Sequence, residues 1–177
     1  MPPEIPQHYP GESATAEQVR CLAEEYRKAA LVLVERGRRG APLTWAPCRL
    51  VAIHAIELFL SALLLHNGHD PSAIRGMQHN LAERAKHAKV DGLQLRKRTE
   101  AHLSEMVGSR EYLATRYGPE TANASQINRL TATLEEIAKK VTDLMHPASK
   151  SRAPVPQRTK SAADKPRPVP VMLEQSR

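Results

Sequence analysis

Residues 48–66 form a segment that is apolar on nearly every side of a helix, and within its apolar run, residues 51–65, only His54, Glu57 and Ser61 are polar. A helix that is hydrophobic all round is buried at the centre of a bundle or spans a membrane. The apolar run, residues 51–65, is about 15 residues long, whereas a membrane span needs roughly 20. The segment therefore predicts the central helix of a soluble, cytoplasmic bundle that has no membrane association.

Hydrophobic periodicity predicts further helices around this one. Ser13 or Thr15 is expected to cap the first, and the last has apolar residues spaced alternately three and four, as in a core-facing helix. No segment shows the alternation of a β-strand, so the sequence predicts an all-α bundle of four to five helices. The predicted helices span residues 16–36, 48–66, about 72–90, 95–113 and 127–144.

Positive charge is concentrated at the C-terminal end of the chain. The formal net charge is +7, of which residues 149–177 carry +5 and residues 1–148 only +2. The last segment has five prolines and no periodicity, which is typical of disorder, and such a basic tail either tethers a protein to RNA or is merely solvated. We therefore expect a loose segment over 1–13, a helical bundle over 14–148 and a disordered basic, Pro-rich tail over 149–177.

The motifs of common enzyme classes are absent from the sequence. It has no Walker loop, glycine-rich dinucleotide turn, HExxH, CxxC or serine nucleophile elbow. Cys21 and Cys48 lack metal-ligand spacing and are expected to be small buried hydrophobes in a reducing compartment. With only six aromatic residues, a base-stacking platform is not expected. The sequence predicts neither a metal nor a cofactor.

Three polar residues of the apolar helix, His54, Glu57 and Ser61, lie along one stripe at helical spacing. A buried carboxylate costs several kcal/mol unless it is paired, so Glu57 is expected to meet an arginine or histidine of another helix. Arg116 is the most attractive candidate, for Glu57 or for a bound anion, because its planar fork holds carboxylate or phosphate. Two interpretations remain open: a structural buried pair, or a ligand-facing or dimer-facing site in which His54 and Glu57 orient the ligand-binding residues.

Residues 74–88 place His79 between Arg75 and Arg84, with Asn80 beside it. If a helix begins near Gln78, the first amides of that helix favour an anion there, and the histidine can donate to a phosphate or carboxylate. The alternative is a histidine that only caps or packs against the helix. The predicted ligand-binding residues are Arg75, His79, Asn80, Arg116 and Tyr117.

Three motifs in this order resemble the HEPN family, helical domains linked to nucleotide binding. They are "AIELFLSALL" at 55–64 followed by Gly68, "QHNLAER" at 78–84, and "YLATRYGP" at 112–119. The resemblance covers about residues 16–146. It implies a helical, non-catalytic module that binds a nucleotide, nucleic acid or protein partner as a homodimer.

The resemblance also implies two alternatives. Catalytic HEPN members are metal-free ribonucleases that use an arginine, four to six intervening residues and a histidine across a dimer, and Arg96 and His102 satisfy that spacing. The chain is then a toxin of a toxin–antitoxin pair. Other members are structural partners of a nucleotidyltransferase. This sequence departs from the family pattern at Ser61, where lysine is frequent, and at Gln78, which replaces a glycine.

Overall fold

The computed structural model describes residue 9, residues 11–118 and residues 124–147. Within these residues the chain forms seven α-helices, one short 3-10 helix and no β-strand, so the predicted all-α fold is confirmed. The helices are α1 Ala16–Val34, η1 Pro42–Trp45, α2 Ala46–His66, α3 Pro71–Gly76, α4 Leu81–Val90, α5 Lys97–Gly108, α6 Glu111–Tyr117 and α7 Ile127–Met145.

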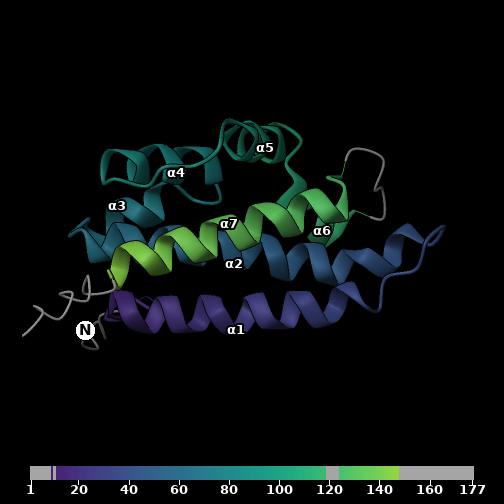
Figure 1. Ribbon diagram of the computed structural model, residues 1–177, viewed down its shortest axis with the longest axis horizontal. Coiled ribbons are helices and arrows are strands. Elements are labelled where there is room, and N and C mark those ends of the chain that lie inside the picture. The colour runs from purple at the N-terminus through teal and green to yellow at the C-terminus, as the bar shows by residue number, and fades with distance from the viewer. Residues whose placement is uncertain (1–8, 10, 119–123, 148–177) are drawn as a thin grey trace, which may run out of the picture.

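Helix α2 is the centre of the bundle, as its all-round apolar sequence predicts. It packs against α1, α7, α4 and α6, and α1, α2 and α7 run side by side along the long axis (Figure 1). Ile56, Phe59 and Leu60 on α2 are fully buried. By length and composition alone residues 42–66 are also apolar enough to cross a membrane, but 61% of an apolar 18-residue window within them is buried inside the protein. This burial is that of a core helix.

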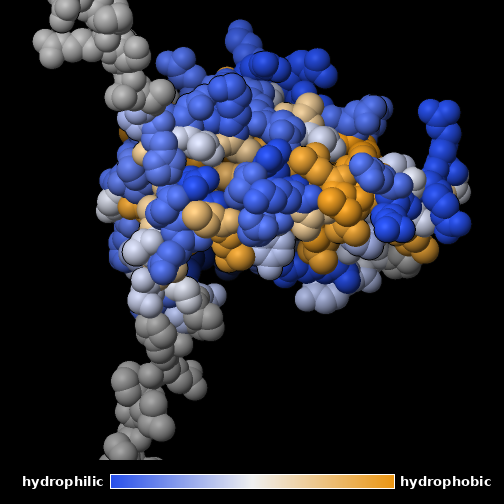
Figure 2. Space-filling model, turned by 60° about the horizontal axis from the view of Figure 1, so that its bottom comes forward, coloured by the Kyte–Doolittle hydropathy of each residue, from blue (hydrophilic) through white to orange (hydrophobic). Residues whose placement is uncertain are grey.

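Helix α1 begins where the sequence predicts, because Thr15 and Gln18 form a capping box. The Thr15 hydroxyl accepts from the Gln18 backbone N–H at 3.2 Å, and the Gln18 side chain accepts from the Thr15 N–H at 2.8 Å. On the α1 side of the bundle, hydrophobic patches interrupt a mostly hydrophilic surface (Figure 2). The large hydrophobic side chains that α1 exposes are Leu22 and Val32, and Cys21 is exposed too, against the prediction that it is buried.

Two of the predicted helices are each divided into two. Residues 77–80 separate α3 from α4, and residues 109–110 separate α5 from α6. Gln78 (φ +48°) and Arg110 (φ +49°) lie in the left-handed region, through which a right-handed helix cannot continue. The described residues therefore form more helices than the predicted four to five, and the helix expected to begin near Gln78 begins three residues later, at Leu81.

Helix α7 confirms the predicted apolar stripe and closes the bundle against α2 and α1. Its C-terminal end returns to the start of α1, where His146 Nε2 lies 3.0 Å from a Glu17 carboxylate oxygen. The last stripe residue, Leu144, is 37% exposed, and Met145 is buried in its place. The predicted disordered tail, 149–177, lies outside the described residues, as do residues 1–8 of the predicted loose N-terminal segment.

Candidate functional site

Glu57 is the centre of a charged cluster where α2, α4 and α6 meet. Its Oε2 lies 3.0 Å from Nδ1 of His79, and its Oε1 accepts a hydrogen bond from Nη2 of Arg84 at 3.3 Å. The expectation that Glu57 meets an arginine or histidine of another helix is thus confirmed. The arginine, however, is Arg84 and not Arg116, which the sequence interpretation preferred.

Arg84 is buried, and each of its three guanidinium nitrogens donates at least one hydrogen bond. Its Nη1 donates to the Ser61 hydroxyl at 2.9 Å, while Nε and Nη2 donate to the Gln78 carbonyl at 3.2 and 2.5 Å. The residue whose carbonyl accepts these two bonds, Gln78, is the one in the left-handed conformation. Burial lowers the pKa of Arg84, and the Glu57 carboxylate partly offsets this effect. Lysine is frequent in the HEPN pattern at the position that Ser61 occupies here. In this chain Arg84 of α4 supplies the counter-ion of Glu57 instead.

His79 is fixed by two neighbours and still has one ring nitrogen available. Its ring stacks, tilted by 36°, on Tyr112 of α6 with centroids 4.4 Å apart. Because a carboxylate only accepts, Nδ1 is the donor to Glu57. The side chain is 35% exposed, and Nε2 has no partner among the described residues. This nitrogen can donate to an anion when the ring is protonated and accept from a hydroxyl when it is neutral.

Arg116 and Tyr117 are exposed at the C-terminal end of α6. Burial lowers the pKa of His54, and the charges of Arg116 and His79 lower it further, while Glu57 raises it. The His54 ring packs edge-on against Tyr26 of α1 at 4.6 Å, and its buried Nδ1 has no hydrogen-bond partner. In this position His54 contacts α1 and does not hydrogen-bond any of the predicted ligand-binding residues.

The other two predicted ligand-binding residues have partners of their own. Arg75 lies 3.6 Å from a Glu12 carboxylate oxygen and over the Tyr9 ring at 4.7 Å. Asn80 is the N-cap of α4, because its side-chain oxygen accepts from the Glu83 backbone N–H at 3.0 Å. The structure thus places His79 in the charged cluster and holds Arg75 and Asn80 in other contacts, while the exposed Arg116 acts there only through its charge on His54.

Arg96 and His102 do not share one site. The Arg96 side chain is 79% exposed and approaches Glu136 at 3.9 Å. His102 is 2% exposed, and its two ring nitrogens contact Thr133 Oγ1 at 2.8 Å and Ser125 Oγ at 2.7 Å. A general base must reach the proton it removes, and here both nitrogens are already engaged. This geometry favours a structural role for His102, and ribonuclease activity stays a prediction.

A second buried network, which the sequence interpretation missed, is centred on Glu111 at the start of α6. Glu111 is 2% exposed, and it accepts from Arg49 Nη1 at 3.1 Å, from the Ser125 N–H at 3.1 Å and from the Ser125 hydroxyl at 2.5 Å. Arg49 also donates to the Ser125 carbonyl. The network fixes the segment before α7 to α2 and α6. Because Ser125 donates to Glu111, His102 donates to Ser125 from Nε2 and accepts from Thr133.

The buried histidines make stability depend on pH. Burial, and secondarily the Arg129 charge, lower the pKa of His102 below its ordinary value of 6.5, so the unfolded chain binds a proton at a higher pH than the folded chain does. Stability is then complete above about pH 6.5 and is lost as pH falls below it. We expect His102→Gln to lose less stability than the wild type between pH 7.5 and pH 5 in urea unfolding. The exposed His66, changed to Gln, is the matched control and should follow the wild type.

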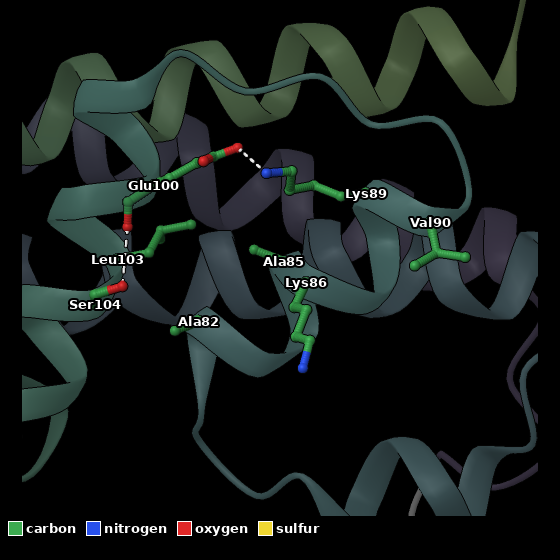
Figure 3. Close-up of a pocket in the computed structure, with 8 residues that line it drawn as sticks. All are labelled: Ala82, Ala85, Lys86, Lys89, Val90, Glu100, Leu103 and Ser104. Carbon is green, nitrogen blue, oxygen red and sulfur yellow. Dashed lines mark hydrogen bonds and ion pairs between the residues drawn. The ribbon is translucent and has the colours of Figure 1, made fainter.

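The groove between α4 and α5 holds no comparable cluster of polar groups. Its volume is about 420 Å³, and Ala82, Ala85 and Leu103 form its apolar part (Figure 3). Lys89 and Glu100 form an ion pair across it at 2.7 Å, while Lys86 points away from that pair (Figure 3). Within the described residues no group of three or more His, Cys, Asp and Glu side chains is placed to hold a metal ion.

The candidate site therefore consists of Glu57, His79, Arg84 and Tyr112 with the exposed Arg116 nearby. Neither Arg84 nor Tyr112 was among the predicted site residues, although both lie inside the motifs that resemble HEPN. In comparisons with known proteins, no family model, curated protein or solved structure matches the chain.

Proposed function

We propose that the chain is a non-catalytic, HEPN-like binding module that holds a phosphate-bearing ligand, a nucleotide or RNA, at the junction of α2, α4 and α6. The observation that carries the proposal is the orientation of His79. Glu57 holds its Nδ1 at 3.0 Å and Tyr112 holds its ring, so Nε2 of this partly exposed side chain has a fixed direction. A binding group fixed in advance loses little conformational entropy when a ligand arrives.

The surroundings of His79 supply the charge and the aromatic surface that such a ligand needs. Arg116 is exposed and has no carboxylate partner among the described residues, so its fork is available to a phosphate. Tyr117, 78% exposed, presents a ring on which a base can stack. The convergence of Glu57, His79 and Tyr112 from three separate motifs also supports the HEPN resemblance. Homodimer formation and a nucleotidyltransferase partner stay predictions from that resemblance.

Thermal unfolding of the full chain with and without ATP, GTP, cyclic nucleotides and short RNA tests the proposal. A ligand at 100 times its Kd is expected to add about 2.7 kcal/mol to the free energy of unfolding. The stabilisation should disappear in His79→Ala and in Arg116→Ala, because each loses a group that contacts the phosphate. Arg39→Ala, which removes an exposed arginine of the loop between α1 and η1, is the matched control and should retain it.

Two results would contradict the proposal. One is that no nucleotide or RNA raises the melting temperature of the wild type. The other is that all three variants respond as the wild type does, which would leave His79 as a packing residue. Growth arrest on expression that is lost in His102→Ala, by contrast, would point to the ribonuclease alternative.

A further inference from the structure

A cavity of about 400 Å³ lies between α5 and the first turns of α7, on residues that the proposed function does not use. Its volume is within the range of small-molecule sites, roughly 300–1,000 Å³. The wall is mostly polar on both helices, with Arg98, His102 and Glu105 from α5, and Gln126, Asn128 and Arg129 from the start of α7.

Arg129 differs from the other partly or fully buried arginines of the described chain. Each of the others has a carboxylate oxygen within 3.6 Å; they are Arg20, Arg27, Arg49, Arg75 and Arg84. Arg129 is half-buried and has no such partner among the described residues, and neither has Arg98 on the opposite side of the cavity. Partial burial lowers the effective dielectric around a charge, so an ion of opposite sign interacts with it more strongly than with a fully exposed charge. An anionic ligand supplies that ion.

The cavity has an excess of positive charge. Burial and the charge of Arg129 lower the pKa of the neighbouring His102, while the Glu111 and Glu105 carboxylates raise it, so Arg129 and Glu105 both act at this cavity. Helix α7 begins at Ile127 without a side-chain cap, and the positive end of its dipole adds to the two arginines. Glu105 is the single carboxylate on the wall. Two arginines and a helix start therefore outweigh one acid.

We propose that this cavity is a second site, which binds the phosphate monoester of a mononucleotide, either free or at the 5′ end of an RNA. Arg98 and Arg129 hold the phosphate in charge-assisted hydrogen bonds. The amides of Gln126 and Asn128 and the carboxylate of Glu105 offer donors and acceptors to the sugar and base. The site does not include His79 or Arg116, so it can be tested separately from the proposed function.

Calorimetric titration of the full chain tests this second site. The probes are inorganic phosphate, the four ribonucleoside monophosphates, adenosine as the phosphate-free control, and one short RNA with either a 5′ phosphate or a 5′ hydroxyl. We expect a phosphorylated probe to bind and Arg129→Gln and Arg98→Gln each to weaken it at least tenfold. Arg39→Gln should leave the affinity unchanged, and Arg116→Ala should retain the binding event that Arg129→Gln weakens. Because Arg129 has no counter-ion in the described structure, its replacement should not lower the melting temperature of the free protein.

The outcomes separate the sources of the phosphate and the two sites. Binding of monophosphates indicates a free nucleotide, and binding of the 5′-phosphorylated RNA alone indicates an RNA end. If no phosphorylated probe binds at millimolar concentration, or if adenosine and 5′-hydroxyl RNA bind equally well, the second site is overturned. Weakening by Arg116→Ala without weakening by Arg129→Gln would likewise assign the ligand to the His79 site and reject this one.

Discussion

Replacing Glu111 by alanine is expected to lower the free energy of unfolding by about 3–5 kcal/mol, the cost of breaking a buried ion pair from one side. The carboxylate is 2% exposed and accepts from Arg49 and from both the N–H and the hydroxyl of Ser125. Without it the Arg49 guanidinium stays buried without its counter-ion, and its Nε already lacks a hydrogen-bond partner. Urea unfolding followed by circular dichroism measures the loss.

Two further variants separate this network from a general effect of losing a carboxylate. Glu105→Ala removes an exposed carboxylate from α5 and should change stability by no more than about 0.5 kcal/mol. The double variant Arg49→Met, Glu111→Leu leaves no unpaired buried charge and should recover much of the loss. A loss below about 1 kcal/mol in Glu111→Ala would contradict the buried network described above.

The positions of the long helices followed from the sequence, and the breaks between the short ones did not. Helix α1 has a capping signal, α2 an all-round apolar surface and α7 a periodic apolar stripe. Each of these signals is contained in the sequence of the helix itself. The breaks at Gln78 and Arg110 depend on left-handed residues that are not glycine. At Gln78 the conformation is tied to a tertiary contact, because its carbonyl accepts from Arg84. Local sequence patterns do not reveal a contact between residues of different elements.

The site was predictable in kind but not in its partners. A polar stripe on an apolar helix predicts that Glu57 pairs with a cation. The spacing of residues within separate helices does not predict which arginine lies opposite Glu57. Arg84 fills this place, and Arg116 remains exposed. Glu111 gave no signal at all, because an acidic residue in the first turn of a helix usually interacts with the helix dipole and solvent. Its burial results from the packing of Arg49 and Ser125 around it.

Replacing Arg84 by alanine is expected to lower the free energy of unfolding by about 3 kcal/mol. The substitution leaves Glu57, whose side chain is only 15% exposed, with His79 as its remaining side-chain partner among the described residues. It also removes the donors to Ser61 and to the Gln78 carbonyl, each of which costs roughly 1 kcal/mol when buried without a partner. Thermal and urea unfolding measure the loss, and Lys86→Ala, at an exposed position of the same helix, is the matched control.

Arg84→Lys distinguishes the charge of this residue from its shape. Lysine keeps the positive charge beside Glu57, but its single ammonium group lacks the planar fork that reaches Ser61, Glu57 and Gln78 at once. If charge alone holds the cluster, Arg84→Lys should be nearly as stable as the wild type. We expect it instead to lose about half as much as Arg84→Ala, because the bonds to Ser61 and Gln78 are neutral acceptor bonds worth roughly 1 kcal/mol each. Gln78 directly precedes His79, so loss of the bond to the Gln78 carbonyl should also make the His79 ring less well fixed. The lysine variant should therefore have a lower affinity for any ligand that His79 Nε2 binds.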